Sequence, residues 1–167
     1  MEYKLRKWTN DDIKDLTKIA NSKDISDKLE DNFPNPYTKK DAELFLTMTK
    51  KADPAFVLMY CIEIDGKPAG SISIIKIDDV NTNSAKIGFW LAKKYWRKGI
   101  MSNVIKEVTA IAFKKFNVIR VNATVFNNNT AARIALENAG YNWEGTMRKA
   151  IVKNEEFHDA IIYGFVK

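Results

Sequence analysis

A strand, a basic loop and a long helix follow one another between residues 87 and 116, and this junction constrains the fold more than any other feature of the chain. Alternating apolar residues predict a strand from Ile87 to Leu91. Apolar residues spaced three and four apart predict a helix that begins at Gly99 and ends near Phe116. The first backbone N–H groups of such a helix have no partner, and the helix dipole adds positive charge there. The junction is therefore suited to hold phosphate.

The loop at this junction is basic but matches no nucleotide-binding pattern. It contains neither Gly-x-x-x-x-Gly-Lys-Ser/Thr nor Gly-x-Gly-x-x-Gly, so neither a P-loop nor a dinucleotide fingerprint fits. Positive side chains around a helix start favour an anionic ligand of another class. The cations of the loop are Lys93, Lys94, Arg97 and Lys98.

The remaining elements are predicted by periodicity, caps and turns. Thr9 and Thr38 stand where helix caps are expected, and Asp65-Gly66 predicts a hairpin turn. Gly140 ends a helix predicted over residues 129–139. The resulting order, β-α-α-β-β-β-α-β-α-β-β, predicts an α+β or mixed α/β fold. The expected strands cover residues 3–7, 56–64, 69–77, 87–91, 119–125, 141–152 and 157–166.

Composition and charge fit one globular domain that spans residues 1–167. The chain has 46% hydrophobic residues, and no apolar run reaches the roughly 18 residues of a membrane span. No apolar stretch follows the first charged residues, so a secretory signal is not expected. The single cysteine, Cys61, excludes an internal disulfide and favours a reducing, cytoplasmic location. The net charge of +6 favours anionic partners, but no nucleic-acid-binding motif accompanies it.

Four motifs follow one another along the chain: Phe33–Thr38, Trp96–Met101, Asn129–Tyr141 and Glu144–Arg148. Together they resemble the GCN5-related N-acetyltransferases (GNAT), and in particular the Rim-type branch that acetylates ribosomal-protein N-termini. Trp96–Met101 is similar to the acetyl-CoA loop Gln/Arg-x-x-Gly-x-Gly/Ala, with the central glycine kept and Trp and Met at the outer positions. Asn129–Tyr141 is similar to Asn-x-Ala-Ser followed by Glu-Lys-Ala-Gly-Phe, and Glu144–Arg148 to Glu-Gly-x-x-Arg. Phe33–Thr38 resembles the substrate-side loop. The resemblance covers nearly the whole chain.

The resemblance implies a fold and a cofactor site. The fold is a twisted, mostly antiparallel sheet of about seven strands, splayed in the middle and flanked by about four helices. Acetyl-CoA would enter the gap between residues 87–92 and 119–126, with its pantetheine arm on the first strand and its pyrophosphate on the loop. Asn129 would contact it near the reacting end, cap its own helix, or do both. Arg133 would reach phosphate or belong to a solvated helix face. The residues that the resemblance assigns to acetyl-CoA are Phe89, Trp90, Leu91, Arg97, Lys98, Gly99, Ile100, Met101, Ser102, Asn129 and Arg133.

The catalytic residues are matched less completely. The Ser of Asn-x-Ala-Ser, a candidate acid near the departing thiol, is Ala132, and the Glu that often precedes Ile-Gly-Phe is Lys86. The remaining polar candidates are Glu144, Tyr141, Tyr163, Tyr37 and the pair His158-Asp159, and of these Glu144 and Tyr141 are assigned as catalytic. Glu144 would accept a proton through water or pair with Arg148, and Tyr141 stands at a position that also fits core packing.

These observations predict an N-acetyltransferase that moves acetyl from acetyl-CoA to a primary amine by direct transfer in a ternary complex. Phe33 and Tyr37 are expected to frame the acceptor entrance, and with one His and one Cys no metal site is expected. Without an evident base, an amine of low pKa is favoured, such as the N-terminal α-amine of a protein or peptide. No nucleic-acid or membrane partner is expected, and the assembly is a monomer or a homodimer.

Two alternatives stay open at this point. The first is a small-molecule acetyltransferase of the same fold, which acts on a polyamine, an amino acid or an aminoglycoside. Such an enzyme for cationic acceptors needs an acidic cleft, and Glu30-Asp31 is the local acidic run. The second is a CoA-binding module without catalysis, which the residues Ala132 and Lys86 suggest.

Overall fold

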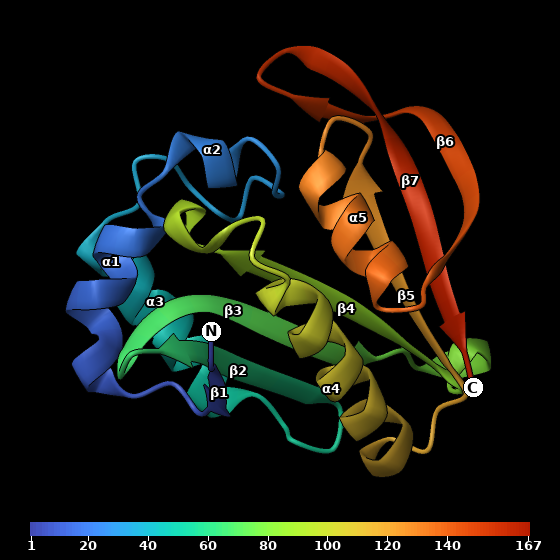
Figure 1. The fold of residues 1–167 in the computed structure, drawn as a ribbon, viewed down its shortest axis with the longest axis horizontal. Helices are drawn as coiled ribbons and strands as arrows, with labels where there is room; N and C mark the ends of the chain where they lie inside the picture. The colour runs from blue at the N-terminus through green and yellow to red at the C-terminus, as the bar shows by residue number, and fades with distance from the viewer.

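The computed structural model describes residues 1–167, and one seven-stranded sheet forms its centre (Figure 1). The strands lie in the order β1-β2-β3-β4-β5-β7-β6. Only β4 and β5 are parallel, and every other neighbouring pair is antiparallel, as predicted. The strands are β1 (Lys4–Arg6), β2 (Val57–Ile64), β3 (Lys67–Lys76), β4 (Ser84–Leu91), β5 (Arg120–Phe126), β6 (Asn142–Lys153) and β7 (Glu156–Val166).

Five α-helices accompany the sheet, and their order with the strands confirms the predicted mixed α/β fold. One of them, α2, was not predicted, because four residues are too few to show a helical period. None of the helices combines the length and the apolar character that crossing a membrane requires. The helices are α1 (Ile13–Ala20), α2 (Lys23–Ser26), α3 (Lys39–Lys51), α4 (Ile100–Lys115) and α5 (Thr130–Asn138).

Two apolar clusters cover the two faces of the sheet. Neighbouring residues of a strand point to opposite faces, and Cys61 and Ile62 of β2 accordingly belong to different clusters. The larger cluster joins α4 and α5 to one face, and the smaller cluster joins α1 and α3 to the other (Figure 1). Burial raises the pKa of the Cys61 thiol to about 12, which makes this cysteine a packing residue and not a nucleophile.

Strand β4 pairs with its two neighbouring strands over unequal lengths. It pairs with β3 from Ala85 to Leu91, which is nearly its whole length. With β5 it pairs only from Ser84 to Lys86, and β5 then continues along β7. The two parallel strands therefore diverge (Figure 1), and the splayed sheet implied by the resemblance is confirmed. From Ile87 onwards, one edge of β4 keeps its backbone hydrogen-bonding groups free of a neighbouring strand.

Some element boundaries differ from the sequence-based prediction. Thr9 caps a short 3-10 turn, and α1 begins only at Ile13. The strand predicted from Ile119 begins at Arg120, and the Ile119 side chain is exposed at the strand end. The predicted hairpin turn is confirmed, since Asp65 and Gly66 have φ angles of 52° and 72° between β2 and β3.

Gly70 sets the closest approach between β3 and the end of β4. A Cβ atom on Gly70 would overlap the carbonyl oxygen of Trp90 and lie 2.9 Å from the Cα of Leu91. Both are backbone atoms, so a Gly70→Ala substitution has to displace β4 itself. We expect this variant to lose roughly 1–3 kcal/mol of unfolding free energy, the usual cost of overpacking.

The matched control is Gly145→Ala, because no atom lies within 4 Å of a Cβ built on Gly145. Urea unfolding of both variants measures the difference. Equal stability of the two variants would contradict the close packing of β3 against β4.

Candidate active site

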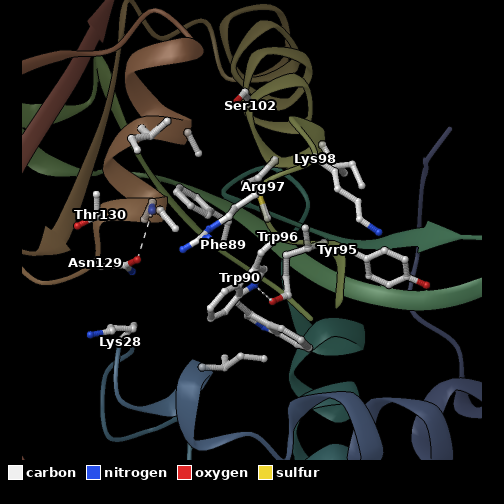
Figure 2. A pocket seen from close by; sticks show the side chains of 18 of the residues that line it. Lys28, Phe89, Trp90, Tyr95, Trp96, Arg97, Lys98, Ser102, Asn129 and Thr130 are labelled. Carbon is white, nitrogen blue, oxygen red and sulfur yellow. Dashed lines mark hydrogen bonds between the residues drawn. The ribbon is translucent and has the colours of Figure 1, made fainter. Parts of the chain in front are cut away.

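A cavity of about 470 Å³ lies beside the end of β4, where the sheet is splayed (Figure 2). Its walls are the end of β4, the loop and first turn of α4, one side of α5 from Asn129 to Asn138, and the segment around α2. Ten of the eleven residues that the resemblance assigned to acetyl-CoA line this one cavity. They are Phe89, Trp90, Leu91, Arg97, Lys98, Gly99, Ile100, Met101, Ser102 and Asn129.

Helix α4 begins at this cavity without a side-chain cap. Its N-cap residue is Gly99, whose φ of 72° is a left-handed conformation that glycine adopts without strain. No side chain bonds the first N–H groups of the helix, so the backbone of Ile100 to Ser102 offers donors at the positive end of the dipole. Figure 2 shows the Arg97 side chain extending into the cavity from the same loop. These donors and this cation fit a phosphate or pyrophosphate group.

Two aromatic residues fix the loop before any ligand binds. The Trp96 indole N–H donates a hydrogen bond of 2.6 Å to the Leu91 carbonyl oxygen. Tyr95 is buried, and the ammonium groups of Lys94 and Lys98 lie 4.7 and 5.6 Å from the centre of its ring. Cations at this distance from an aromatic face are attracted to it. The loop is thus held to the strand that it follows, which lowers the entropy that ligand binding has to remove.

The segment around α2 forms a wall that sequence reasoning missed. Ile25 and Leu29 line the cavity with apolar side chains, and Lys28 adds a further cation (Figure 2). Asp24 forms an ion pair of 2.7 Å with Lys93, which connects this wall to the basic loop before α4. No motif or periodicity marks these residues, because only the tertiary fold brings them to the cavity.

Asn129 and Arg133 lie one helical turn apart at the start of α5, but their side chains line different pockets. The Asn129 Oδ1 accepts a hydrogen bond of 3.2 Å from the Ala132 N–H, so Asn129 caps α5 while it lines the cavity. The Arg133 Nε donates to the Tyr163 hydroxyl at 3.4 Å, and that hydroxyl donates to Glu137 at 2.6 Å. Arg133 therefore lies in a separate groove, and the structure does not bring it to the cavity of the other ten residues.

The loop expected to frame the acceptor entrance packs against β4. The Phe33 ring lies 5.1 Å from that of Tyr37 and 5.4 Å from that of Trp90, measured between ring centres. Tyr37 is buried, and this burial raises the pKa of its hydroxyl to about 12. Phe33 thus packs against Trp90 of β4, with Tyr37 beside it, on the face that α1 and α3 cover.

The two catalytic candidates lie away from the cavity. Glu144 pairs with Arg120 and not with Arg148, and the Arg120 Nη1 donates to its Oε1 at 2.7 Å. These hydrogen bonds hold the pKa of Glu144 below its usual range, which makes it a weak base. Tyr141 is buried with its hydroxyl 2.7 Å from Thr109 Oγ1, and burial raises its pKa to about 12.

The structure also places the two residues that depart from the family pattern. Ala132 lines the cavity beside Asn129 and carries no group that titrates. Lys86 is the last residue of β4 that pairs with β5, so it stands where the strands part. Its ammonium group lies 3.7 Å from Glu30. No group of three His, Cys, Asp or Glu side chains has the arrangement of a metal site.

Comparison with known proteins identifies the family. The chain matches the model of the acetyltransferase (GNAT) domain over residues 3–142. The protein therefore belongs to the GNAT acetyltransferase family, which confirms the resemblance of its motifs.

Individual relatives agree with this membership. The chain is 32% identical over 103 residues to the "Putative ribosomal N-acetyltransferase YdaF" of Bacillus subtilis, over 62% of this chain and 56% of the relative. It spans about half the length of the curated relatives that it matches first. A solved structure of RimL, a ribosomal L7/L12 alpha-N-protein acetyltransferase in complex with coenzyme A, aligns with a TM-score of 0.84 and 20% identity, over 98% of this chain and 93% of that one. Spermidine N-acetyltransferase from Vibrio cholerae, in complex with CoA and spermine, aligns with a TM-score of 0.80 and 19% identity, over 98% and 95% of the two chains. At these identities the two structures show a shared fold.

The hydrogen bond between Trp96 and Leu91 gives a direct test of the loop. Trp96→Phe keeps an aromatic ring and removes the donor, so the loop loses its attachment to β4. We expect CoA to bind roughly twofold to tenfold more weakly, which corresponds to one neutral hydrogen bond. Isothermal titration calorimetry with CoA measures this change.

Trp143→Phe is the matched control. Its indole N–H donates to Thr146 Oγ1 at 3.3 Å on the exposed edge strand, away from the cavity. Equal CoA affinities for the two variants would show that the loop does not need its anchor on β4.

Proposed function

We propose that this protein transfers an acetyl group from acetyl-CoA to the N-terminal α-amine of a protein or peptide. The observation that carries the proposal is the cavity beside the splayed part of β4, where a free strand edge meets an uncapped helix start. The names of the relatives YdaF and RimL support an acceptor of the ribosomal-protein type. The buried, unpaired thiol of Cys61 supports a reducing compartment such as the cytoplasm.

The residues of the cavity fit the parts of acetyl-CoA. The N–H groups of Ile100 to Ser102 and the Arg97 guanidinium would hold the pyrophosphate. The edge of β4 at Phe89 to Leu91, which has no neighbouring strand on this side, would bond the amide groups of the pantetheine arm, as a neighbouring strand would. Acetyl-CoA supplies an acyl group on a thiol that leaves readily, since thiols have a pKa of about 8.5.

The same strand edge serves the reaction itself. A backbone N–H of β4 that points at the acyl oxygen would stabilise the negative charge that develops there. The acceptor nitrogen would form a bond to the acyl carbon as the carbon–sulfur bond breaks. The electron pair of that bond would leave on the CoA thiolate, and the amine proton would pass to solvent. The one carboxylate that lines the cavity, Asp24, is paired with Lys93, and no imidazole lines it, so the residues present hold and polarise the acyl group more than they move protons.

This lack of a base determines which acceptor suits the site. Deprotonation of an α-amine, with a pKa near 8, costs roughly 1 kcal/mol at pH 7. A lysine side chain with a pKa of about 10.4 costs roughly 4.6 kcal/mol by the same arithmetic. Glu144 is paired with Arg120 and Tyr141 is buried, so neither residue helps to deprotonate a lysine amine. The α-amine is therefore the better acceptor.

The small-molecule alternative is best represented by a polyamine acceptor, which the spermidine acetyltransferase neighbour suggests. A polyamine needs carboxylates that no cation already neighbours, but a lysine lies beside each member of the acidic run. Glu30 lies 3.7 Å from Lys86, and Asp31 lies 2.7 Å from Lys153. These two lysines repel a polycation, and this repulsion favours the α-amine over a polyamine.

Two otherwise identical peptides test the acceptor class. One has a free N-terminus and no lysine, and the other has a blocked N-terminus and a single lysine. We expect kcat/KM for the α-amine to exceed that for the lysine amine by roughly two to three orders of magnitude, from the difference in deprotonation cost. The rate should rise with pH and level off near the pKa of the acceptor amine. Detection of free CoA thiol over pH 6–10, a range of about two units around that pKa, measures both.

Faster turnover of the lysine peptide or of spermidine would reject the α-amine assignment. It would also mean that a protein base acts, and Glu144→Gln would then identify or exclude Glu144 as that base. CoA binding without thiol release from any amine would favour the non-catalytic alternative.

A further inference from the structure

Lys86 occupies a position that the proposed reaction leaves unexplained, and the inference drawn from it rests on the proposed function. Lys86 pairs with Asn122 of β5 in the last register position before β4 and β5 part. Lys86 lies where β4 and β5 separate. The part of β4 that lines the cavity, with Phe89 and Trp90, follows it along the strand. A positive charge at this point faces any acceptor that approaches along β4.

The side chain lies on the acceptor face of the sheet. Neighbouring side chains of β4 point to opposite faces of the sheet. Ile87 and Leu91 belong to the large cluster under α4, so the other face carries Lys86, Gly88 and Trp90. Trp90 packs instead against Phe33 and the smaller cluster. Lys86 therefore points to the face of the Phe33 loop and not to the face of α4.

This face is open next to Lys86. Gly88 is exposed and has no side chain, so the strand backbone is uncovered between Lys86 and Trp90. Across the ladder, Ile75 pairs with Lys86 and is 45% exposed. On the other side, Thr124 of β5 is exposed on the same face as Asn122. An acceptor chain can thus reach the ammonium group from solvent.

The charge of Lys86 is only loosely compensated. Its partner Glu30 is 3.7 Å away, and the two side chains are 51% and 71% exposed. An exposed ion pair of this kind contributes between about 0 and 1 kcal/mol. A carboxylate that arrives with the acceptor can therefore replace Glu30 at little cost. The neighbouring Asp31 does not compete for Lys86, because it pairs with the nearly buried Lys153.

We propose that Lys86 binds a carboxylate that the acceptor carries close to its reacting α-amine, and so makes the enzyme selective for such acceptors. Two sources supply this chemistry. One is an acidic side chain next to the N-terminus of a peptide, and the other is the α-carboxylate of a free amino acid. An acceptor with a second cation in that place meets Lys86 as a like charge, which disfavours its binding.

The test compares three peptides that differ only in their second residue, Ser-Glu, Ser-Gln and Ser-Lys, together with free serine and serine amide. The wild-type protein should show kcat/KM for Ser-Glu about tenfold or more above that for Ser-Lys, as one favourable and one unfavourable charge contact require. Lys86→Gln should bring the three peptides to within about threefold of one another, and Lys86→Glu should reverse their order. Lys115→Gln, at the far end of α4, is the control and should keep the wild-type order.

The amino-acid arm distinguishes the two sources. Faster turnover of serine than of serine amide indicates that Lys86 binds an α-carboxylate. A charge preference that is seen only among the peptides indicates that Lys86 binds an acidic second residue. If kcat/KM for the three peptides keeps its wild-type order in Lys86→Gln, the inference is overturned. An equal loss of kcat/KM with all three peptides also overturns it, because that loss would be a structural effect. If Lys86→Glu does not fold, as judged by circular dichroism, Lys86→Gln and Lys86→Met carry the test. Turnover of peptides without charge preference removes only this inference, whereas absence of turnover with every acceptor removes the proposed function as well.

Discussion

Strand β4 is bonded to β3 along nearly its whole length but to β5 at only three register positions, and the candidate site depends on this asymmetry. The bonded edge holds β4 rigidly in the sheet. The free edge presents backbone groups that a buried strand would otherwise have to pair. A ligand with amide groups of its own can supply those partners, so the break in the sheet becomes a binding surface.

The crossover after β4 adds the second half of the site. Parallel strands require a long connection, and α4 provides it between β4 and β5. Its start therefore falls beside the end of β4, where Gly99 leaves the first turn uncapped. The Trp96 indole ties this turn back to β4. The uncapped start of α4 and the strand edge are thus fixed relative to each other by covalent connection and one hydrogen bond.

Local sequence patterns predict the parts of the molecule that local interactions determine. The alternation from Ile87 to Leu91, the helical spacing after Gly99 and the turn at Asp65-Gly66 all report interactions within a few residues. The same patterns supported a family resemblance, which extended the prediction to ten residues of one cavity.

Tertiary contacts explain what the sequence did not predict. The wall formed by Ile25 and Leu29 belongs to a helix of four residues and the turn that follows it, and its contact with the cavity depends on the whole fold. Glu144 and Arg148 are four residues apart, but β6 is a strand with irregular register, and the partner of Glu144 comes from β5 instead. Arg133 follows Asn129 by one turn, yet the Tyr163 hydroxyl draws it into another groove. Spacing along the chain determines neither partner.

The central claim is that the free edge of β4 and the first turn of α4 together bind CoA. Backbone amide chemical shifts, recorded by NMR during a CoA titration of the isotope-labelled protein, test it most directly. The account predicts that the largest shift changes fall at Phe89 to Leu91 and at Arg97 to Ser102. Small changes there, with the largest changes in the groove around Arg133 and Tyr163, would contradict it.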